Sequence, residues 1–247
     1  MNAGVLAFGD SITNGGGELQ WGVALQSWAL WTARGLGLPY TGYAVDGANV
    51  RHVVEHQIPA FEQRTAIPQA RYDLGCLYIG VNDVRALDWD KDAFAHDHAQ
   101  AVAFLKARCD RVLLVTLPED LGVPRAGHVD EANAIILAAD ETTLDLRDFG
   151  ARNLVMTDHV HPTAFGQVWI AERALRTLEM DVRVWPSTLI HPGERSRFRA
   201  LQGDWTYVYR AFKERARPGD RARRAARAAA ARIGSPRTAA GRTPEAP

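Results

Sequence analysis

Two kinds of segment alternate between residues 5 and 178, and this alternation restricts the fold more than any other feature. Short apolar runs, typical of strands buried on both faces, are followed by segments whose apolar residues recur at helical spacing. The predicted strands are 5–8, 40–45, 74–79, 111–117 and 142–146, and the predicted helices are 21–36, 50–61, 90–108, 129–139 and 162–178. Elements in this order form a parallel sheet covered by helices on both faces. We therefore predict an α/β fold, a three-layer α/β/α sandwich around a central, mostly parallel five-stranded sheet.

Two prolines are expected to affect the predicted helices. Pro59 lies inside the segment 50–61 and is predicted to interrupt it, because proline removes a helical hydrogen bond. Pro162 is predicted to lie in the first turn of the last helix, where a missing amide hydrogen costs nothing.

The pattern changes after about residue 180, and this change predicts three parts. Residues 1–180 form the α/β domain, residues 181–217 form an aromatic-containing appendage packed on it, and residues 218–247 form an Ala/Arg/Pro-rich tail with too little apolar surface to fold. The formal net charge of the chain is zero, but residues 210–247 carry eleven Lys and Arg against three Asp and Glu. Such a basic tail can contact nucleic acid or an anionic surface, but we favour a solvated extension and expect no nucleic-acid partner.

Several other classes of protein are not supported by the sequence. No apolar run reaches the roughly 18 residues of a membrane span, and no secretion signal is recognisable, so we expect a cytoplasmic protein without a membrane span. Cys76 and Cys109 lie in or beside apolar segments and form no CxxC motif, so we predict buried thiols. No cluster of metal-ligating residues is present, so we expect neither metal nor cofactor, and the sequence predicts no oligomeric state.

Four polar turns are the candidate functional elements. They contain, in order, Gly9-Asp10-Ser11, Asp46-Gly47-Ala48, Gly80-Val81-Asn82-Asp83 and Asp158-His159-Val160-His161. The first three follow the first three predicted strands, so in a parallel sheet they share the edge where ligands bind. Together they supply a hydroxyl, a glycine amide, an asparagine amide and an Asp-x-x-His pair. These groups are the nucleophile, oxyanion donors, base and orienting carboxylate that acyl transfer needs.

From about residue 4 to residue 178 the chain resembles the GDSL-type SGNH hydrolases, because these four blocks match that family's motifs in order. Ser11, Gly47, Asn82 and His161 fill the four namesake positions. The resemblance implies the flavodoxin-like SGNH hydrolase fold and an esterase acting on a small-molecule ester. It also implies that Ser11 is the nucleophile, His161 the base and Asp158 its orienting partner. The oxyanion donors would be the backbone amides of Ser11 and Gly47 and the side-chain amide of Asn82.

Other functions and structural roles remain open at this point. The same site can transfer an acyl group to another acceptor or deacetylate carbohydrates, and a non-catalytic binding protein can share the fold. Further alternatives concern single residues: Ser11 as a cap or turn serine, Asn82 as a turn residue, Asp158 as a cap of the last helix, and His159 as a competitor of His161. Asp10 is expected to accept turn amides, Asp83 to orient the turn that carries Asn82, and Trp21 to line the acyl pocket or the core.

Overall fold

A computed structural model describes residues 2–17, 25–64, 70–121, 128–150, 154–156 and 158–180. The chain divides into two units, Met1–Ala200 and Leu201–Pro247, and every described residue belongs to the first. The predicted appendage (181–217), the predicted tail (218–247) and Trp21 lie outside the described residues. The expectations for these segments therefore stay predictions.

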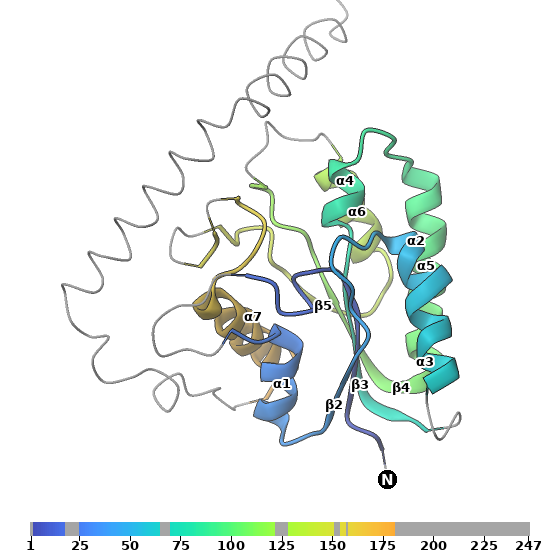
Figure 1. The fold of residues 1–247 in the computed structure, drawn as a ribbon, viewed down its shortest axis with the longest axis vertical. Coiled ribbons are helices and arrows are strands. Elements are labelled where there is room, and N and C mark those ends of the chain that lie inside the picture. Colours follow the sequence, from blue (N-terminus) through green and yellow to red (C-terminus); the bar gives the residue numbers. More distant parts are fainter. Residues whose placement is uncertain are drawn as a thin grey trace, which may run out of the picture. The chain divides into compact units, whose positions relative to one another are not determined.

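Five strands form a parallel sheet at the centre of the fold (Figure 1). The strands are β1 (Val5–Gly9), β2 (Tyr40–Gly42), β3 (Tyr72–Tyr78), β4 (Cys109–Val115) and β5 (Thr142–Leu144). Their spatial order is β2-β1-β3-β4-β5, and each neighbouring pair is parallel. This is the flavodoxin-like order, and it confirms the predicted five-stranded sheet.

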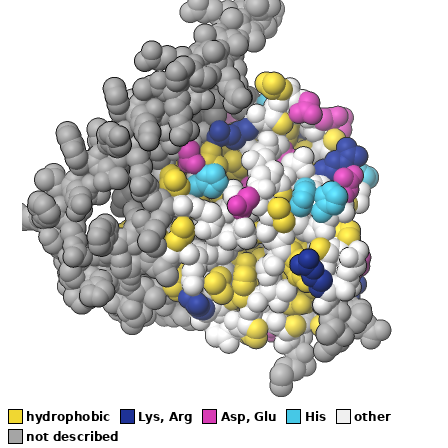
Figure 2. All heavy atoms as spheres, in the orientation of Figure 1, with side chains coloured by type: hydrophobic (Ala, Val, Ile, Leu, Met, Phe, Trp, Pro, Cys, Tyr) yellow, Lys and Arg dark blue, Asp and Glu magenta, His cyan; other side chains and the backbone are white. Residues whose placement is uncertain are grey.

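Helices cover both faces of this sheet, which confirms the predicted three layers. The helical elements are α1 (Trp28–Leu36), α2 (Val50–His52), the π-helical η1 (Val53–Gln57), α3 (Ile58–Arg64), α4 (Val81–Arg85), α5 (Lys91–Arg108), α6 (Val129–Leu137) and α7 (Ala164–Thr177). Figure 1 shows α1 and α7 on one face and α2, α3 and α5 on the other. Charged and histidine side chains lie on the outer surface beside α2 and α5 (Figure 2). Arg51 on α2 and Glu55 on η1 form an exposed ion pair, with Arg51 Nε 2.8 Å from Glu55 Oε1. None of the described helices is long and apolar enough to cross a bilayer.

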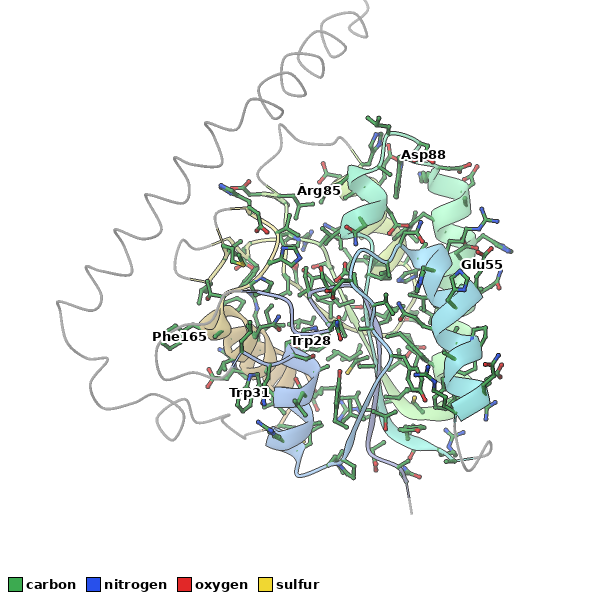
Figure 3. The ribbon with its side chains drawn as sticks, viewed as in Figure 1. Trp28, Trp31, Glu55, Arg85, Asp88 and Phe165 are labelled. Carbon is green, nitrogen blue, oxygen red and sulfur yellow. The ribbon has the colours of Figure 1, made fainter. Side chains whose placement is uncertain are left out.

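The core is apolar on both sides of the sheet, as the strand sequences predict. All five residues of β1 are buried because helices pack above and below them. Trp28 points from α1 toward the sheet, with its ring 6.3 Å from that of Tyr78 on β3, whereas Trp31 packs against α7 (Figure 3). The contact of Trp31 with α7 holds α1 and α7 side by side. Cys76 and Cys109 are free thiols and both are buried, as predicted.

Several details of the helices differ from the predictions. α1 begins at Trp28 with Ser27 as its N-cap, so the described residues 25–27 of the helix predicted over 21–36 are not helical. Pro59 does not interrupt its helix, because the preceding π-helical turn lets the N–H of Ile58 bond to Val53 five residues back, and the helical path continues to Arg64. Pro162 lies before α7 and not in its first turn, because Thr163 is the N-cap and its hydroxyl accepts from the N–H of Gly166. The turn after β3 is the short helix α4, which was not predicted.

Candidate active site

Ser11 lies at the point where the strand order of the sheet reverses. β1 has β2 as its neighbour on one side and β3 on the other. Ligands of doubly wound sheets bind at such a point, beside the carboxyl ends of the strands. A tight turn holds the residue there. Oδ1 of Asp10 accepts from the N–H of Ile12 at 2.9 Å, and the carbonyl of Ser11 accepts from the N–H of Gly16 at 2.7 Å. Asp10 thus accepts one amide of this turn, and its supporting role at the site stays a prediction.

His161 and Asp158 reach this turn from the loop before α7. Ser11 Oγ is 2.7 Å from His161 Nε2, and His161 Nδ1 is 2.6 Å from Asp158 Oδ2. The other oxygen of Asp158 accepts from the backbone N–H groups of Val160 (2.9 Å) and His161 (3.0 Å). Asp158 therefore shapes its own loop with one oxygen and contacts the imidazole with the other.

Two alternatives from the sequence are wrong in this loop. Asp158 does not cap α7, since Thr163 does. His159 does not take the place of His161, because the ring nitrogen 2.7 Å from Ser11 Oγ is Nε2 of His161, while Nδ1 of His159 lies 3.7 Å from Asp120 Oδ2.

The close approach of two loops brings the serine and the histidine together. Gly17 lies so near Pro162 that a Cβ at this position would overlap the Pro162 carbonyl oxygen. Only glycine allows the loop after Ser11 to dock this tightly on the residue after His161.

The asparagine of the third block is tied to the second block. Asn82, in the first turn of α4, donates from Nδ2 to the carbonyl of Ala48 at 2.8 Å. Both oxygens of Asp83 accept from the N–H of Val50, at 3.1 and 3.2 Å, which links the turn that carries Asn82 to the start of α2. Gly47 has a φ of +77°, a left-handed conformation that favours glycine. A side-chain amide has two N–H donors, so the bond to Ala48 uses one and orients the other.

The charges around His161 favour its protonated form. The hydrogen bond to Asp158 raises the pKa of His161 above 6.5 despite partial burial, and the carboxylates of Asp10 and Asp46 act in the same direction. Burial by itself raises the pKa of Asp158, but the bonds from His161 and from the N–H groups of Val160 and His161 outweigh it and hold that pKa below its usual value.

Two carboxyls beside the site, the buried Asp10 and the half-buried Asp83, have raised pKa values. Burial raises the pKa of Asp10 to about 7, against the opposing effects of the Ile12 amide and of His161. Oδ2 of Asp10 is buried and has no hydrogen-bond partner among the described residues. Burial likewise raises the pKa of Asp83 to about 6, opposed by the amide of Val50.

Two buried glutamines near the site escaped the sequence analysis. The side chain of Gln57 makes two hydrogen bonds with the backbone of Gly9: it accepts from the N–H at 3.0 Å and donates to the carbonyl at 2.8 Å. Gln167 on α7 bonds to the loop that follows Ser11. The sequence signal that could have identified both glutamines is a polar residue at a position where the helical pattern favours an apolar one.

A serine, a histidine and a carboxylate in sequential hydrogen-bond contact, at the ligand edge of an α/β sheet, are typical of serine hydrolases. The sequence matches the model of the GDSL-like Lipase/Acylhydrolase family over residues 7–169, and the chain belongs to that family. It is accordingly a hydrolase that cleaves esters.

Solved structures share the fold at low sequence identity. Axe2, an acetylxylan esterase from Geobacillus stearothermophilus, is 20% identical with a TM-score of 0.54, and the match covers 72% of this chain and 94% of that one. The acetyl xylan esterase AlAXEase is 22% identical with a TM-score of 0.55, covering 71% of this chain and 99% of that one. A search of curated proteins found no match.

Proposed function

We propose that this protein is a serine esterase that hydrolyses a carboxylic or acetyl ester of a small molecule through an acyl-enzyme on Ser11. The observation that carries the proposal is the hydrogen-bond chain from Ser11 Oγ through His161 to Asp158, at 2.7 and 2.6 Å. A neutral serine is a weak nucleophile, and an imidazole at this distance is placed to take its proton.

The proposed reaction has two halves. Ser11 Oγ attacks the ester carbonyl carbon while its proton passes to Nε2 of His161. When the tetrahedral intermediate collapses, His161 returns that proton to the departing alkoxide, and the acyl group stays on Oγ as an ester. Water then attacks the acyl carbon, again losing its proton to His161, which returns it to Ser11 Oγ as the acid leaves. Asp158 holds the histidine tautomer and stabilises the imidazolium in both halves.

The proposed oxyanion donors are the backbone amides of Ser11 and Gly47 and the side-chain amide of Asn82. Replacing Asn82 with alanine is expected to lower kcat about 10²- to 10³-fold, because one donor contributes about 2.7–4 kcal/mol of transition-state stabilisation. Steady-state kinetics with p-nitrophenyl acetate measure the effect.

The matched control for this variant is Asn49→Ala. Asn49 caps α2 in the same turn region by accepting from the N–H of His52, so its loss affects stability by about 1 kcal/mol and leaves kcat nearly unchanged. An Asn82→Ala enzyme with a kcat close to that of the wild type contradicts the assignment.

The activity is expected to rise with pH and then level off. His161 accepts a proton only when neutral, and its raised pKa keeps it protonated to a higher pH than a free histidine. The midpoint of kcat/KM should therefore lie above 6.5, the ordinary value, with low activity on the acid side. A profile recorded from about pH 5 to about pH 9 tests this. Activity that falls steadily from acid to neutral pH is incompatible with His161 as base.

A substrate panel tests the proposed function directly. It contains p-nitrophenyl esters of increasing acyl length and acetylated sugars, the latter because solved structures with this fold include acetylxylan esterases. Added alcohols and amines reveal transfer in place of hydrolysis. We expect the wild-type protein to hydrolyse at least one ester class much faster than the Ser11→Ala variant. Equal rates for the two proteins on every ester overturn the proposal.

A further inference from the structure

One buried side chain on α7 bonds to three backbone groups of the N-terminal part of the chain. Nε2 of Gln167 donates to the carbonyls of Ile12 and Gly16, both at 3.0 Å. Its Oε1 accepts from the N–H of Trp28, the first residue of α1, at 2.8 Å. The side chain is fully buried, and its bonds to Ile12 and Trp28 are buried, whereas the bond to Gly16 is partly buried. Trp28 and α7 lie on the same face of the sheet (Figure 3).

These three bonds join the two halves of the candidate active site. Ile12 follows Ser11 directly, and the N–H of Gly16 is bonded to the carbonyl of Ser11. α7 begins at Ala164, three residues after His161. Ser11 and His161 are separated by 150 residues of chain, so their 2.7 Å contact depends on noncovalent bonds between these two segments.

We infer that Gln167 is a positioning residue, which holds the turn that carries Ser11 against the helix whose entry carries His161. The inference rests on the proposed function, because it assigns Gln167 a role in that reaction. An amide is required by the bonding pattern: two carbonyl oxygens need N–H donors, and the N–H of Trp28 needs an acceptor. A small shift of the serine relative to the histidine is costly, since a misplacement of about 1 Å can lower a rate about 10²-fold.

A structural glutamine would stabilise the fold without affecting the reaction, and Asn133 shows what such a residue looks like. Asn133 is also buried and binds backbone groups from a helix, accepting from the N–H of Leu117 at 2.7 Å and donating to its carbonyl at 2.9 Å. It clamps the chain after β4, and both of these bonds go to Leu117, which lies neither in the turn of Ser11 nor in the loop of His161. It is therefore the matched control for the loss of buried amide bonds.

The test compares Gln167→Glu and Gln167→Met with Asn133→Asp and Asn133→Leu in the full-length protein. Glutamate keeps the shape of the side chain but directs oxygen at the two carbonyls, and methionine removes all three bonds. For each variant we would measure Tm, kcat and KM for p-nitrophenyl acetate, and the rate of inactivation by a fluorophosphonate. The Gln167 variants are expected to lose about 10- to 100-fold in kcat and in inactivation rate with little change in KM. The Asn133 variants should show a decrease in Tm similar to that of the Gln167 variants, with kcat unchanged.

The outcomes separate this inference from the proposed function. Gln167 variants that fold and react at the wild-type rate overturn the inference, as does an equal loss of kcat in the Asn133 variants. A wild-type protein that neither hydrolyses esters nor reacts with the fluorophosphonate overturns the proposed function itself. If both Gln167 variants fail to fold, Gln167→Asn retains the amide on a shorter side chain. A lowered kcat of the Gln167→Asn protein supports the inference, and a wild-type kcat contradicts it.

Discussion

Replacing Ser11 with alanine is expected to lower kcat for ester hydrolysis on the order of 10⁶-fold, the loss typical of removing the nucleophile of a serine hydrolase. The variant keeps the turn but has no Oγ to attack the carbonyl carbon, so no acyl-enzyme can form. Under the proposed mechanism, the residual rate then comes from substrate binding and the proposed oxyanion donors alone. Initial rates with p-nitrophenyl acetate, corrected for hydrolysis in buffer, measure the loss.

The control for this variant is another serine of the same chain. Ser27 caps α1, where its side chain accepts from the N–H of Ala29 at 3.1 Å. Its replacement by alanine should cost about 1 kcal/mol of stability and preserve kcat. A Ser11→Ala protein that hydrolyses the ester at a substantial fraction of the wild-type rate, with the same KM, shows that the reaction does not proceed through Ser11.

Replacing Asp158 with asparagine is expected to lower kcat on the order of 10⁴-fold. Asparagine can still accept the two backbone N–H bonds that shape the loop, so the fold of the loop should persist. Its NH₂ group or neutral oxygen, however, cannot stabilise the imidazolium of His161 as the carboxylate does at 2.6 Å. Because the bond to Asp158 is the largest cause of the raised pKa of His161, the midpoint of the remaining pH profile should move to lower pH.

Asp120→Asn is the matched control for this variant. Asp120 is a carboxylate near the other histidine of the loop, 3.7 Å from Nδ1 of His159. Its replacement should leave both the plateau rate and the midpoint of the pH profile near the wild-type values. Loss of activity in both variants to the same degree would mean that the loop needs negative charge in general. An unchanged midpoint in the Asp158→Asn protein contradicts the proposed pairing with His161.

Much of the fold follows from local patterns in the sequence. The apolar runs that became β1, β3 and β4 are long or continuous enough to identify as buried strands, and their alternation with helices implies a parallel sheet. A parallel sheet in turn places the turns after β1, β2 and β3 at one edge. From this placement the sequence predicts that Ser11, Asn82 and the Asp46-Gly47 turn lie near one another.

Other features depend on distant parts of the chain, and the sequence patterns do not contain them. α4 has only five residues, too few to show helical periodicity, and its Gly80 and Asn82 look like turn residues. The π-helical turn before Pro59 is a local backbone adjustment without a composition signal. The bonds of Gln57 and Gln167 join residues far apart in the chain, so only the folded structure shows which backbone groups they satisfy.

The central claim is that Ser11 is an activated nucleophile, and labelling with a fluorophosphonate tests it most directly. Mass spectrometry of the intact protein and of its peptides would be recorded after reaction with the probe. We predict one adduct per wild-type chain, located on Ser11, absent from Ser11→Ala and formed much more slowly in Asp158→Asn. A wild-type protein that hydrolyses esters while Ser11 stays unmodified, or an adduct on another residue, contradicts the account.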